Sequence, residues 1–182
     1  MRGSRSFAAG ILTLLLLAAC SSDISEPGVV LEAWIDAAFE GDPDASQTYI
    51  ASDDIPWIGL GASPEAFAAG SAPFQSTNIV SECTSDHTLG RCETTWTDLW
   101  IDAIPELDEG FIRITAEVED GKIVAFREWV FSPEVVNASG QHVDWLELYE
   151  PEKLEAACGA DIAAAECSQL LVDTVEMWVA DR

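Results

Sequence analysis

The stretch from Glu109 to Phe131 constrains the fold most strongly, because it predicts two long strands joined by a tight turn. Asp120-Gly121 separates two runs rich in β-branched and aromatic residues, and such a pair favours a type I′ turn with positive φ at both positions. This turn pairs Val118 with Ile123 and fixes the register outward from there. One face of the hairpin is then almost entirely apolar, which predicts an antiparallel sheet with that face in the core.

Arg127 is the exception on this apolar face, where the register sets it opposite Ile114. Removing one partner of a buried ion pair costs about 3–5 kcal/mol, so a buried guanidinium needs an anion beside it. We therefore expect Arg127 to be largely buried, to line the cavity of the domain and to bind Asp98. Asp36 is the second choice of partner, and the anion of a ligand is the alternative.

Residues 1–19 have the composition of a secretory signal peptide. Arg2 and Arg5 give a positive start, and the apolar run from Phe7 to Ala19 is shorter than the roughly 20 residues that a membrane-spanning helix needs. Polar residues follow at once, so a signal sequence is favoured over a membrane helix.

The tetrad Leu17-Ala18-Ala19-Cys20 resembles the lipobox of bacterial lipoproteins. The resemblance implies cleavage before Cys20 and attachment of fatty acid, such as palmitate, to its thiol. It also implies a protein that is lipid-anchored to a bacterial membrane on the extracytoplasmic side. Acyl chains contribute about 0.8 kcal/mol per buried CH₂, so several chains hold a domain at a bilayer. Residues 20–26 would be the tether, and an ordinary signal peptide is the alternative.

Residues 27–182 are long enough for one domain with a sizeable core. The formal net charge of the chain is −25, and a surface this acidic repels nucleic acid and attracts cations. We therefore exclude nucleic acid as a partner. The seven tryptophans and the apolar content argue against disorder.

Besides Cys20, the chain has four cysteines, and an even number outside the cytoplasm indicates disulfide bonds. Four cysteines allow three connectivities. Cys83 and Cys92 flank a short loop between two expected strands, whereas Cys158 and Cys167 flank a connection between helices. We favour these two local pairs. A zinc site is the alternative, but the sequence offers no close cysteine or histidine pairs for it.

Periodicity and capping residues predict helices on either side of a block of strands. The first helix is expected from Pro27 to Glu40 and Asp42 would cap a second one, which begins at Pro43. The other expected elements are a strand at 55–60, a helix at 63–70, strands at 76–84 and 91–101, helical segments after Pro133 that include 143–149, and a last helix at 161–180. Helices segregated from an antiparallel sheet define the α+β class.

Residues 30–36 with Gly41-Asp42, and residues 118–123 at the hairpin, resemble the nuclear transport factor 2-like superfamily, which includes the SnoaL-like polyketide cyclases. The resemblance covers about residues 27–131. It implies a cystatin-like cone, in which a curved antiparallel sheet wraps on the N-terminal helices around an apolar pocket. Residues 132–182 would be a C-terminal helical extension, which departs from the pattern, as do the four cysteines.

Enzymes of this superfamily, such as ketosteroid isomerase, use a carboxylate base together with a phenol and a protonated acid. Aligned by eye, the phenol position falls at Trp34, the base position in Ile58-Gly59-Leu60 and the second acid near Ile114. None of these side chains can take the corresponding role, so we do not expect isomerase chemistry by that arrangement.

Other catalytic patterns are missing from the sequence as well, including a glycine-rich phosphate loop and a Gly-x-Ser-x-Gly motif. His87 falls in an expected hairpin loop and His142 near an expected helix start, so we expect surface residues rather than bases. Asp42 and its acidic neighbours only loosely match a calcium loop, since Gln47 stands where that loop needs glycine. No catalytic residue, metal or cofactor is expected.

A ligand pocket in the cone is the remaining hypothesis, because pockets of this kind are mostly aromatic and apolar. Core packing is the alternative role for the tryptophans. The expected lining residues are Trp34, Trp57, Trp96, Asp98, Trp100, Ile114, Arg127 and Trp129.

The sequence thus predicts a lipoprotein that binds a small apolar or weakly acidic ligand without catalysis, with the lipid bilayer as a partner through Cys20. A cyclase or isomerase-like enzyme with an altered site is the first alternative. A protein-interaction module, including a homodimer, is the second.

The lipid anchor gives a direct test at Cys20. Cys20→Ala removes the thiol that would carry the acyl chains, so the protein should leave the membrane fraction and accumulate in the soluble or uncleaved pool. Fractionation and labelling with a fatty acid measure both effects. Labelled fatty acid on the variant would contradict the assignment.

Overall fold

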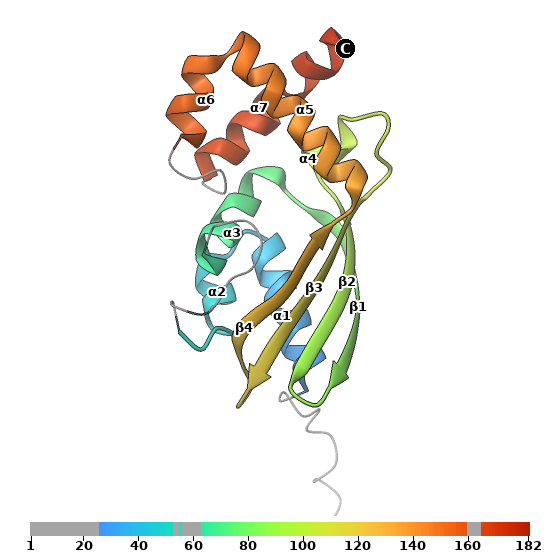
Figure 1. Cartoon of the computed structure of the whole chain (residues 1–182), viewed down its shortest axis with the longest axis vertical. Helices are drawn as coiled ribbons and strands as arrows, with labels where there is room; N and C mark the ends of the chain where they lie inside the picture. Colours follow the sequence, from blue (N-terminus) through green and yellow to red (C-terminus); the bar gives the residue numbers. More distant parts are fainter. Residues whose placement is uncertain (1–25, 53–54, 56–62, 160–164) are drawn as a thin grey trace, which may run out of the picture.

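Four strands form one antiparallel sheet in the order β1-β2-β3-β4, so each strand lies beside its neighbour in sequence (Figure 1). The computed structural model describes residues 26–52, 55, 63–159 and 165–182. The strands are β1 (Thr77–Asp86), β2 (Leu89–Thr97), β3 (Gly110–Glu119) and β4 (Lys122–Phe131). The sheet curves around the first helix, and the C-terminal helices lie at one end of it (Figure 1). This arrangement confirms the predicted α+β class and its cone.

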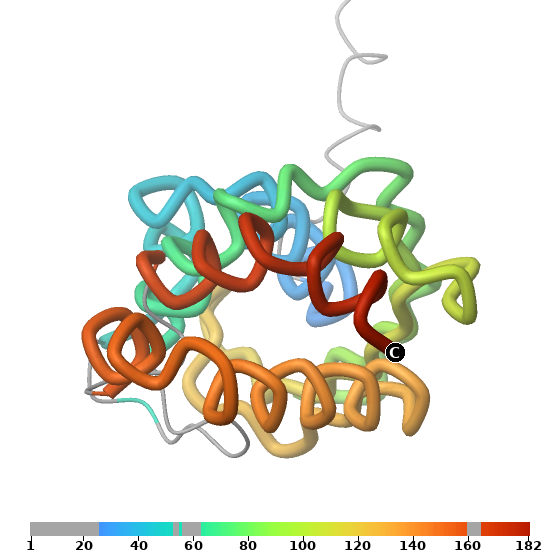
Figure 2. The backbone as a smooth tube through the Cα atoms, turned by 90° about the horizontal axis from the view of Figure 1, so that it is seen from above, coloured from blue at the N-terminus to red at the C-terminus, as the bar shows by residue number. Residues whose placement is uncertain are grey.

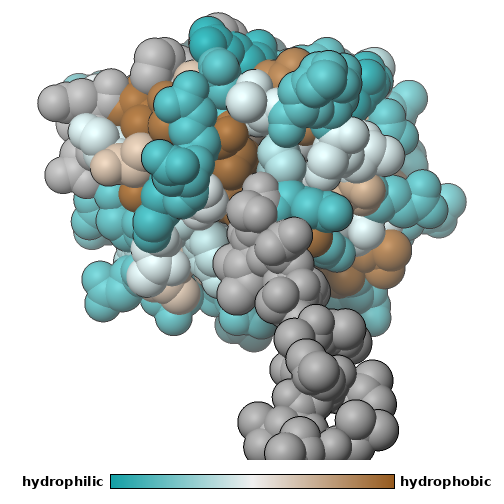
Figure 3. Space-filling view, turned by 90° about the horizontal axis from the view of Figure 1, so that it is seen from below, coloured by the Kyte–Doolittle hydropathy of each residue, from teal (hydrophilic) through white to brown (hydrophobic). Residues whose placement is uncertain are grey.

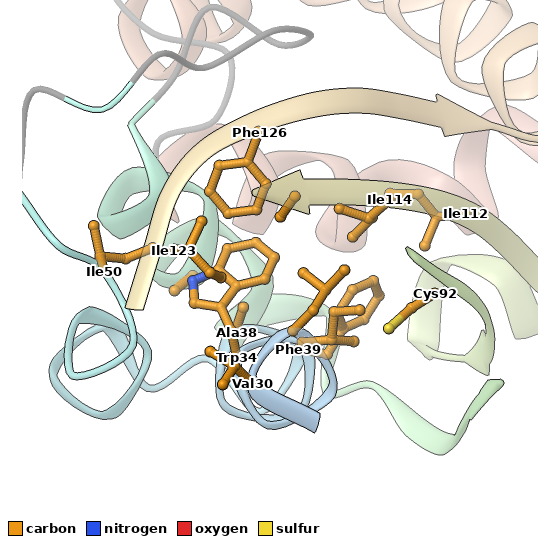
Figure 4. Close-up of a cluster of buried hydrophobic side chains, with 14 of the residues drawn as sticks. Val30, Trp34, Ala38, Phe39, Ile50, Cys92, Ile112, Ile114, Ile123 and Phe126 are labelled. Atoms are coloured by element: carbon orange, nitrogen blue, oxygen red, sulfur yellow. The ribbon is translucent and has the colours of Figure 1, made fainter. Parts of the chain in front are cut away.

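Helix α1 (Pro27–Phe39) packs into the concave face of the sheet because most of its side chains are apolar and buried. Trp34 is fully buried, and its ring centroid lies 4.8 Å from that of Phe126 on β4. Side chains from α1, β2, β3 and β4 meet in this core (Figure 4). Fully burying one large apolar side chain is worth about 1.5–3 kcal/mol, so this cluster is the main source of stability of the cone.

Helices α2 (Pro43–Gln47) and α3 (Pro64–Ser71) begin at prolines that follow side-chain caps. Asp42 caps α2 and Ser63 caps α3, each by accepting a backbone hydrogen bond three residues ahead. The 3₁₀ helix η1 (Ala72–Phe74) then leads into the sheet. Except for Ile55, the strand expected at 55–60 lies outside the described residues.

The turn between β3 and β4 confirms the predicted start of the hairpin. Asp120 and Gly121 have φ values of 49° and 73°, and both are positive as a type I′ turn requires. Val118 pairs with Ile123, as this turn predicts.

Further from the turn the predicted register is wrong, because β4 contains two bulges. The ladder slips by one residue at Val124 and again at Arg127, so that Ile114 pairs with Trp129. A bulge bends its strand and increases the local twist. The two bulges therefore curve β4 around α1, and they turn Phe126 into the core, where it is fully buried.

Arg127 is exposed on the side of the sheet away from the core, so the prediction of a buried partner of Asp98 or Asp36 is wrong. Its side chain is 52% exposed, and its Nε donates to Glu117 Oε2 at 3.1 Å. The bulge is the physical reason, because one extra residue turns the next side chain to the opposite face. An exposed pair of this kind contributes about 0–1 kcal/mol.

The strand expected at 91–101 ends at Thr97, because the next residues form helix α4 (Leu99–Asp102). Asp98 caps this helix by accepting hydrogen bonds from the backbone N–H groups of Trp100 and Ile101, at 2.9 and 2.7 Å. Aspartate is among the strongest N-cap residues, since it satisfies donors that the first turn leaves open. This cap was not predicted from the sequence.

Helices α5 (Pro133–Tyr149), α6 (Pro151–Cys158) and α7 (Ala165–Asp181) follow the sheet. The start of the last helix expected at 161 lies outside the described residues. Helices α5 and α7 lie side by side at one end of the sheet (Figures 1 and 2). They pack on α4 in a second apolar cluster, formed by Trp100, Ile101, Ile104, Val135, Val175 and Trp178. The opposite end of the molecule is mainly hydrophilic, with smaller apolar patches (Figure 3).

Two disulfides confirm the predicted local pairs. Cys83 bonds to Cys92 between β1 and β2, and Cys158 bonds to Cys167 between α6 and α7. Closing loops of this size is worth about 2–3 kcal/mol in the chain-entropy model. Disulfides persist in oxidising compartments, so they indicate a location outside the cytoplasm. Within the described part of the chain, no helix is long and apolar enough to span a bilayer.

His142 is fully buried within α5, so the prediction of a surface position is wrong. Its Nδ1 accepts a hydrogen bond from Trp100 Nε1 at 3.0 Å, and its Nε2 lies 3.0 Å from Thr174 Oγ1. Thr174 Oγ1 donates its own proton to the carbonyl oxygen of Leu170, so it accepts one from His142. The neutral imidazole with its proton on Nε2 therefore satisfies every partner. Its ring also stacks on Trp178, with centroids 4.7 Å apart.

This arrangement predicts a loss of stability in mild acid. Burial, aided by the charge of Arg182, lowers the pKa of His142 from 6.5 to about 4. Below pH 6.5 the unfolded chain therefore binds a proton that the folded protein does not, and stability falls as the pH drops toward 4. We expect the free energy of unfolding in urea to fall by about 2 kcal/mol between pH 7 and pH 5.

Substitution of each histidine in turn isolates this effect. His142→Gln should remove most of the change between pH 7 and pH 5, because glutamine does not titrate. His87→Gln is the matched control at the exposed histidine of the β1–β2 turn and should keep it. The same pH dependence in both variants would contradict the assignment.

Candidate functional site

A cavity of about 320 Å³ lies where the core of the cone meets the C-terminal helices. Residues far apart in the sequence converge there, from α1, α3, β2, α4, β4, α5 and α7. Most of the lining side chains are aromatic or aliphatic, which is typical of small-molecule sites. The lining residues are Phe39, Phe67, Gly70, Ser71, Phe74, Ser76, Trp96, Asp98, Trp100, Ile101, Phe131, Val135, Val136, Ser139, Ser168 and Leu171.

Aromatic rings of the cone form one wall of this cavity. The ring centroids of Phe39 and Trp96 lie 4.9 Å apart with an angle of 62° between their planes, and Phe131 lies 6.3 Å from Trp96. Edge-to-face pairs of this kind are worth about 0.5–1.5 kcal/mol beyond the area that they bury. Trp96 also pairs with Gly110 on β3, and its ring packs directly on that glycine. The indole is therefore held in one orientation.

Among the described residues that line the cavity, Asp98 is the one that carries a charge, and it is only 6% exposed. Its Oδ1 accepts the two backbone hydrogen bonds that cap α4, and its Oδ2 accepts one from Trp96 Nε1 at 2.8 Å. Burial raises the pKa of Asp98, although these hydrogen bonds oppose the rise, and nearby Asp102 adds to it. All three partners donate, so the contacts are those of an ionised carboxylate.

The remaining polar groups of the cavity are serine hydroxyls. Ser71 Oγ, for example, donates to the carbonyl oxygen of Phe67 at 3.0 Å. Among the residues that the structure describes, no histidine, cysteine or basic side chain lines the cavity. The site thus offers apolar surface and one carboxylate, without a nucleophile beside a nitrogen base. In the same part of the chain, no cluster of three histidine, cysteine or acidic side chains could hold a metal ion.

Three of the residues predicted for the pocket line this cavity, namely Trp96, Asp98 and Trp100. Three others, Trp34, Ile114 and Trp129, lie in the packed core of the cone. Arg127 is at the surface, as described above. Trp57 and the segment 58–60 lie outside the described residues.

The C-terminal helices supply a wall that the sequence analysis missed. Val135 and Ser139 of α5, four residues apart, face the cavity together with Ser168 and Leu171 of α7, three residues apart. Spacings of three and four residues place side chains on the same face of a helix. That signal was present in the sequence, but nothing in the sequence indicated which element this face would meet.

Similar solved structures share the fold but little sequence with this chain. An uncharacterised cystatin-fold protein from Novosphingobium aromaticivorans is 16% identical, with a TM-score of 0.42 over 58% of this chain and 97% of that one. A nuclear transport factor 2-like protein of unknown function from Cytophaga hutchinsonii is 10% identical, with a TM-score of 0.43 over 60% and 92%.

A third structure belongs to a protein from Silicibacter that is provisionally assigned as a polyketide cyclase. It is 19% identical to this chain, with a TM-score of 0.41 over 59% of this chain and 89% of that one. No protein-family model matches the sequence, and no curated protein matches it significantly. The function proposed below therefore rests on the cavity.

The contact between Gly110 and Trp96 predicts the effect of one added methyl group. A Cβ at position 110 would overlap the indole of Trp96, so Gly110→Ala must displace this ring and reshape the cavity. We expect a loss of about 1–3 kcal/mol in the free energy of unfolding, measured by urea denaturation.

Gly140→Ala on α5 is the matched control, because an added Cβ there meets nothing within 4 Å. It should leave stability unchanged or raise it by about 0.5–1 kcal/mol, since alanine favours a helix more than glycine does. Equal stability of the two variants would mean that the ring of Trp96 is not held by Gly110.

Proposed function

We infer that the protein binds a small apolar molecule in the cavity between the cone and the C-terminal helices, without catalysis. The observation that carries this proposal is the cavity itself, a hollow of about 320 Å³ whose lining is mostly aromatic and aliphatic, as is typical of small-molecule sites. Its volume lies near the lower end of the roughly 300–1,000 Å³ of small-molecule sites. The ligand would therefore be about the size of a medium-length alkyl chain or a small ring system.

The charge of the residues that line the cavity limits the chemical class of the ligand further. The sequence analysis allowed a weakly acidic ligand because it placed Arg127 in the pocket, but this guanidinium is on the outer surface. The described lining instead carries the carboxylate of Asp98. A carboxylate ligand would meet a like charge in a site of low dielectric, which is unfavourable. An apolar ligand without negative charge is therefore favoured.

We also propose that the protein works outside the cytoplasm as a lipoprotein. The two disulfides support an oxidising compartment. The anchor at Cys20 lies outside the described residues, and the lipobox supports it. The bilayer is the only macromolecular partner that we propose.

An enzyme with an altered site is the second candidate, and Asp98 is the observation that favours it. A carboxylate whose pKa is raised by burial in an apolar cavity is a typical general base. However, the positions that hold the other two catalytic groups in ketosteroid isomerase fall near Trp34 and Ile114, which are packed in the core. Binding without catalysis thus needs fewer assumptions.

Octanol is a suitable neutral probe for this cavity. A variant that fills the cavity with a larger side chain tests whether octanol binds there. We expect octanol to bind the wild-type protein in isothermal titration calorimetry with a stoichiometry of about one per chain, as one cavity requires. Ser139→Trp places an indole in the cavity and should abolish this binding without loss of thermal stability.

Asn137→Trp is the matched control, because position 137 is exposed and points to the opposite side of α5. It should bind octanol as the wild type does. If the wild-type protein binds no octanol, or if Ser139→Trp binds it unchanged, the proposed site is wrong. Hydrogen exchange at carbons beside the carbonyl of octan-2-one, lost in Asp98→Asn, would instead support the enzyme.

A further inference from the structure

We propose that the polar end of the ligand is an ammonium group, which pairs with the carboxylate of Asp98. The inference rests on the proposed function, since it concerns the same cavity. It names the chemistry that the cavity recognises, a positively charged amine attached to an apolar body.

Asp98 has unused hydrogen-bonding capacity. A carboxylate has about four acceptor sites, two on each oxygen. In this structure Oδ1 accepts two hydrogen bonds and Oδ2 accepts one, from Trp96. One acceptor site on Oδ2 therefore stays available, on a side chain that lines the cavity and is 94% buried.

The charge of Asp98 also favours a cation. In the described structure no basic side chain forms an ion pair with it, and its three donors are two backbone groups and an indole. A buried charge without a counter-ion is costly, so a cation that enters the cavity gains more from this carboxylate than it would from one in water. An ammonium group supplies both the positive charge and the missing donor.

The surroundings of the carboxylate favour a cation as well. The rings of Phe39, Trp96 and Phe131 belong to the same cavity, and aromatic faces attract ammonium groups by about 0.5–2 kcal/mol. The net charge of −25 also raises the concentration of cations near the protein. An anionic head group has none of these advantages.

A series of three octyl compounds tests the inference on the wild-type protein. Octylamine, octanol and octanoate share one apolar chain and differ in the charge of the head group. We expect octylamine to bind about tenfold or more tightly than octanol in calorimetry at pH 7, as a hydrogen bond to a charged group implies. Octanoate should bind most weakly. Equal binding of octylamine and octanol, or tighter binding of octanoate, would overturn the inference.

Two substitutions assign the preference to one carboxylate. Asp98→Asn keeps an oxygen that can cap α4 but removes the charge and the acceptor for Trp96 Nε1, so octylamine should lose its advantage, measured as the ratio of its affinity to that of octanol in the same variant. Asp102→Asn removes the same charge from an exposed position on α4 and should keep the advantage. If Asp98→Asn retains the preference for the amine, the inference is wrong.

The pH dependence of the two affinities tests the inference on the wild-type protein. Protonation of Asp98 removes the negative charge, so the advantage of octylamine over octanol should decline as the pH falls toward the pKa of this carboxyl, which burial raises. A constant ratio of the two affinities from pH 7 to pH 4 would overturn the inference. Failure of octanol itself to bind is a different result, because it contradicts the proposed site and not merely its preference for amines.

Discussion

The carboxylate of Asp98 connects the two halves of this molecule. It ends β2, caps α4 through two backbone hydrogen bonds and fixes the indole of Trp96 in the cone. Helix α4 in turn carries Trp100, on which the C-terminal helices pack. One side chain therefore orients Trp96 in the aromatic wall of the cavity. It also caps α4, the helix on which the C-terminal helices of the opposite wall pack.

Local patterns in the sequence predicted the parts of the fold that depend on neighbouring residues. The Asp120-Gly121 turn, the cap of α2 and both disulfides depend on short spacings. The bulges in β4, which curve the strand around α1, do not depend on such spacings, and nothing in the alternation of side chains marks them. Because the predicted register lacked these bulges, it placed Arg127 in the core instead of at the surface, and it suggested a site for an anion. His142 was missed for a similar reason, since its partners come from α4 and α7.

The position of the cavity follows from how the cone is filled. Trp34, Phe126 and Trp129 pack against one another inside the curved sheet and, with the isoleucines of β3 and β4, form its close-packed core. The space that is left lies beyond this core, where α5 and α7 cover the end of the sheet (Figure 2). The extension thus supplies one side of a cavity whose other side is formed by the sheet and its first helices.

The order of the elements along the chain also decides when this cavity can exist. Along the chain, Phe39 is the first of the residues that line the cavity and Leu171 is the last. During synthesis the chain can bury the core of the cone before α7 has been made, since the N-terminal part of a protein emerges first. During that interval the aromatic wall of the cavity is open to solvent. The last helix therefore adds its side of the cavity only after the rings of the opposite wall are in place.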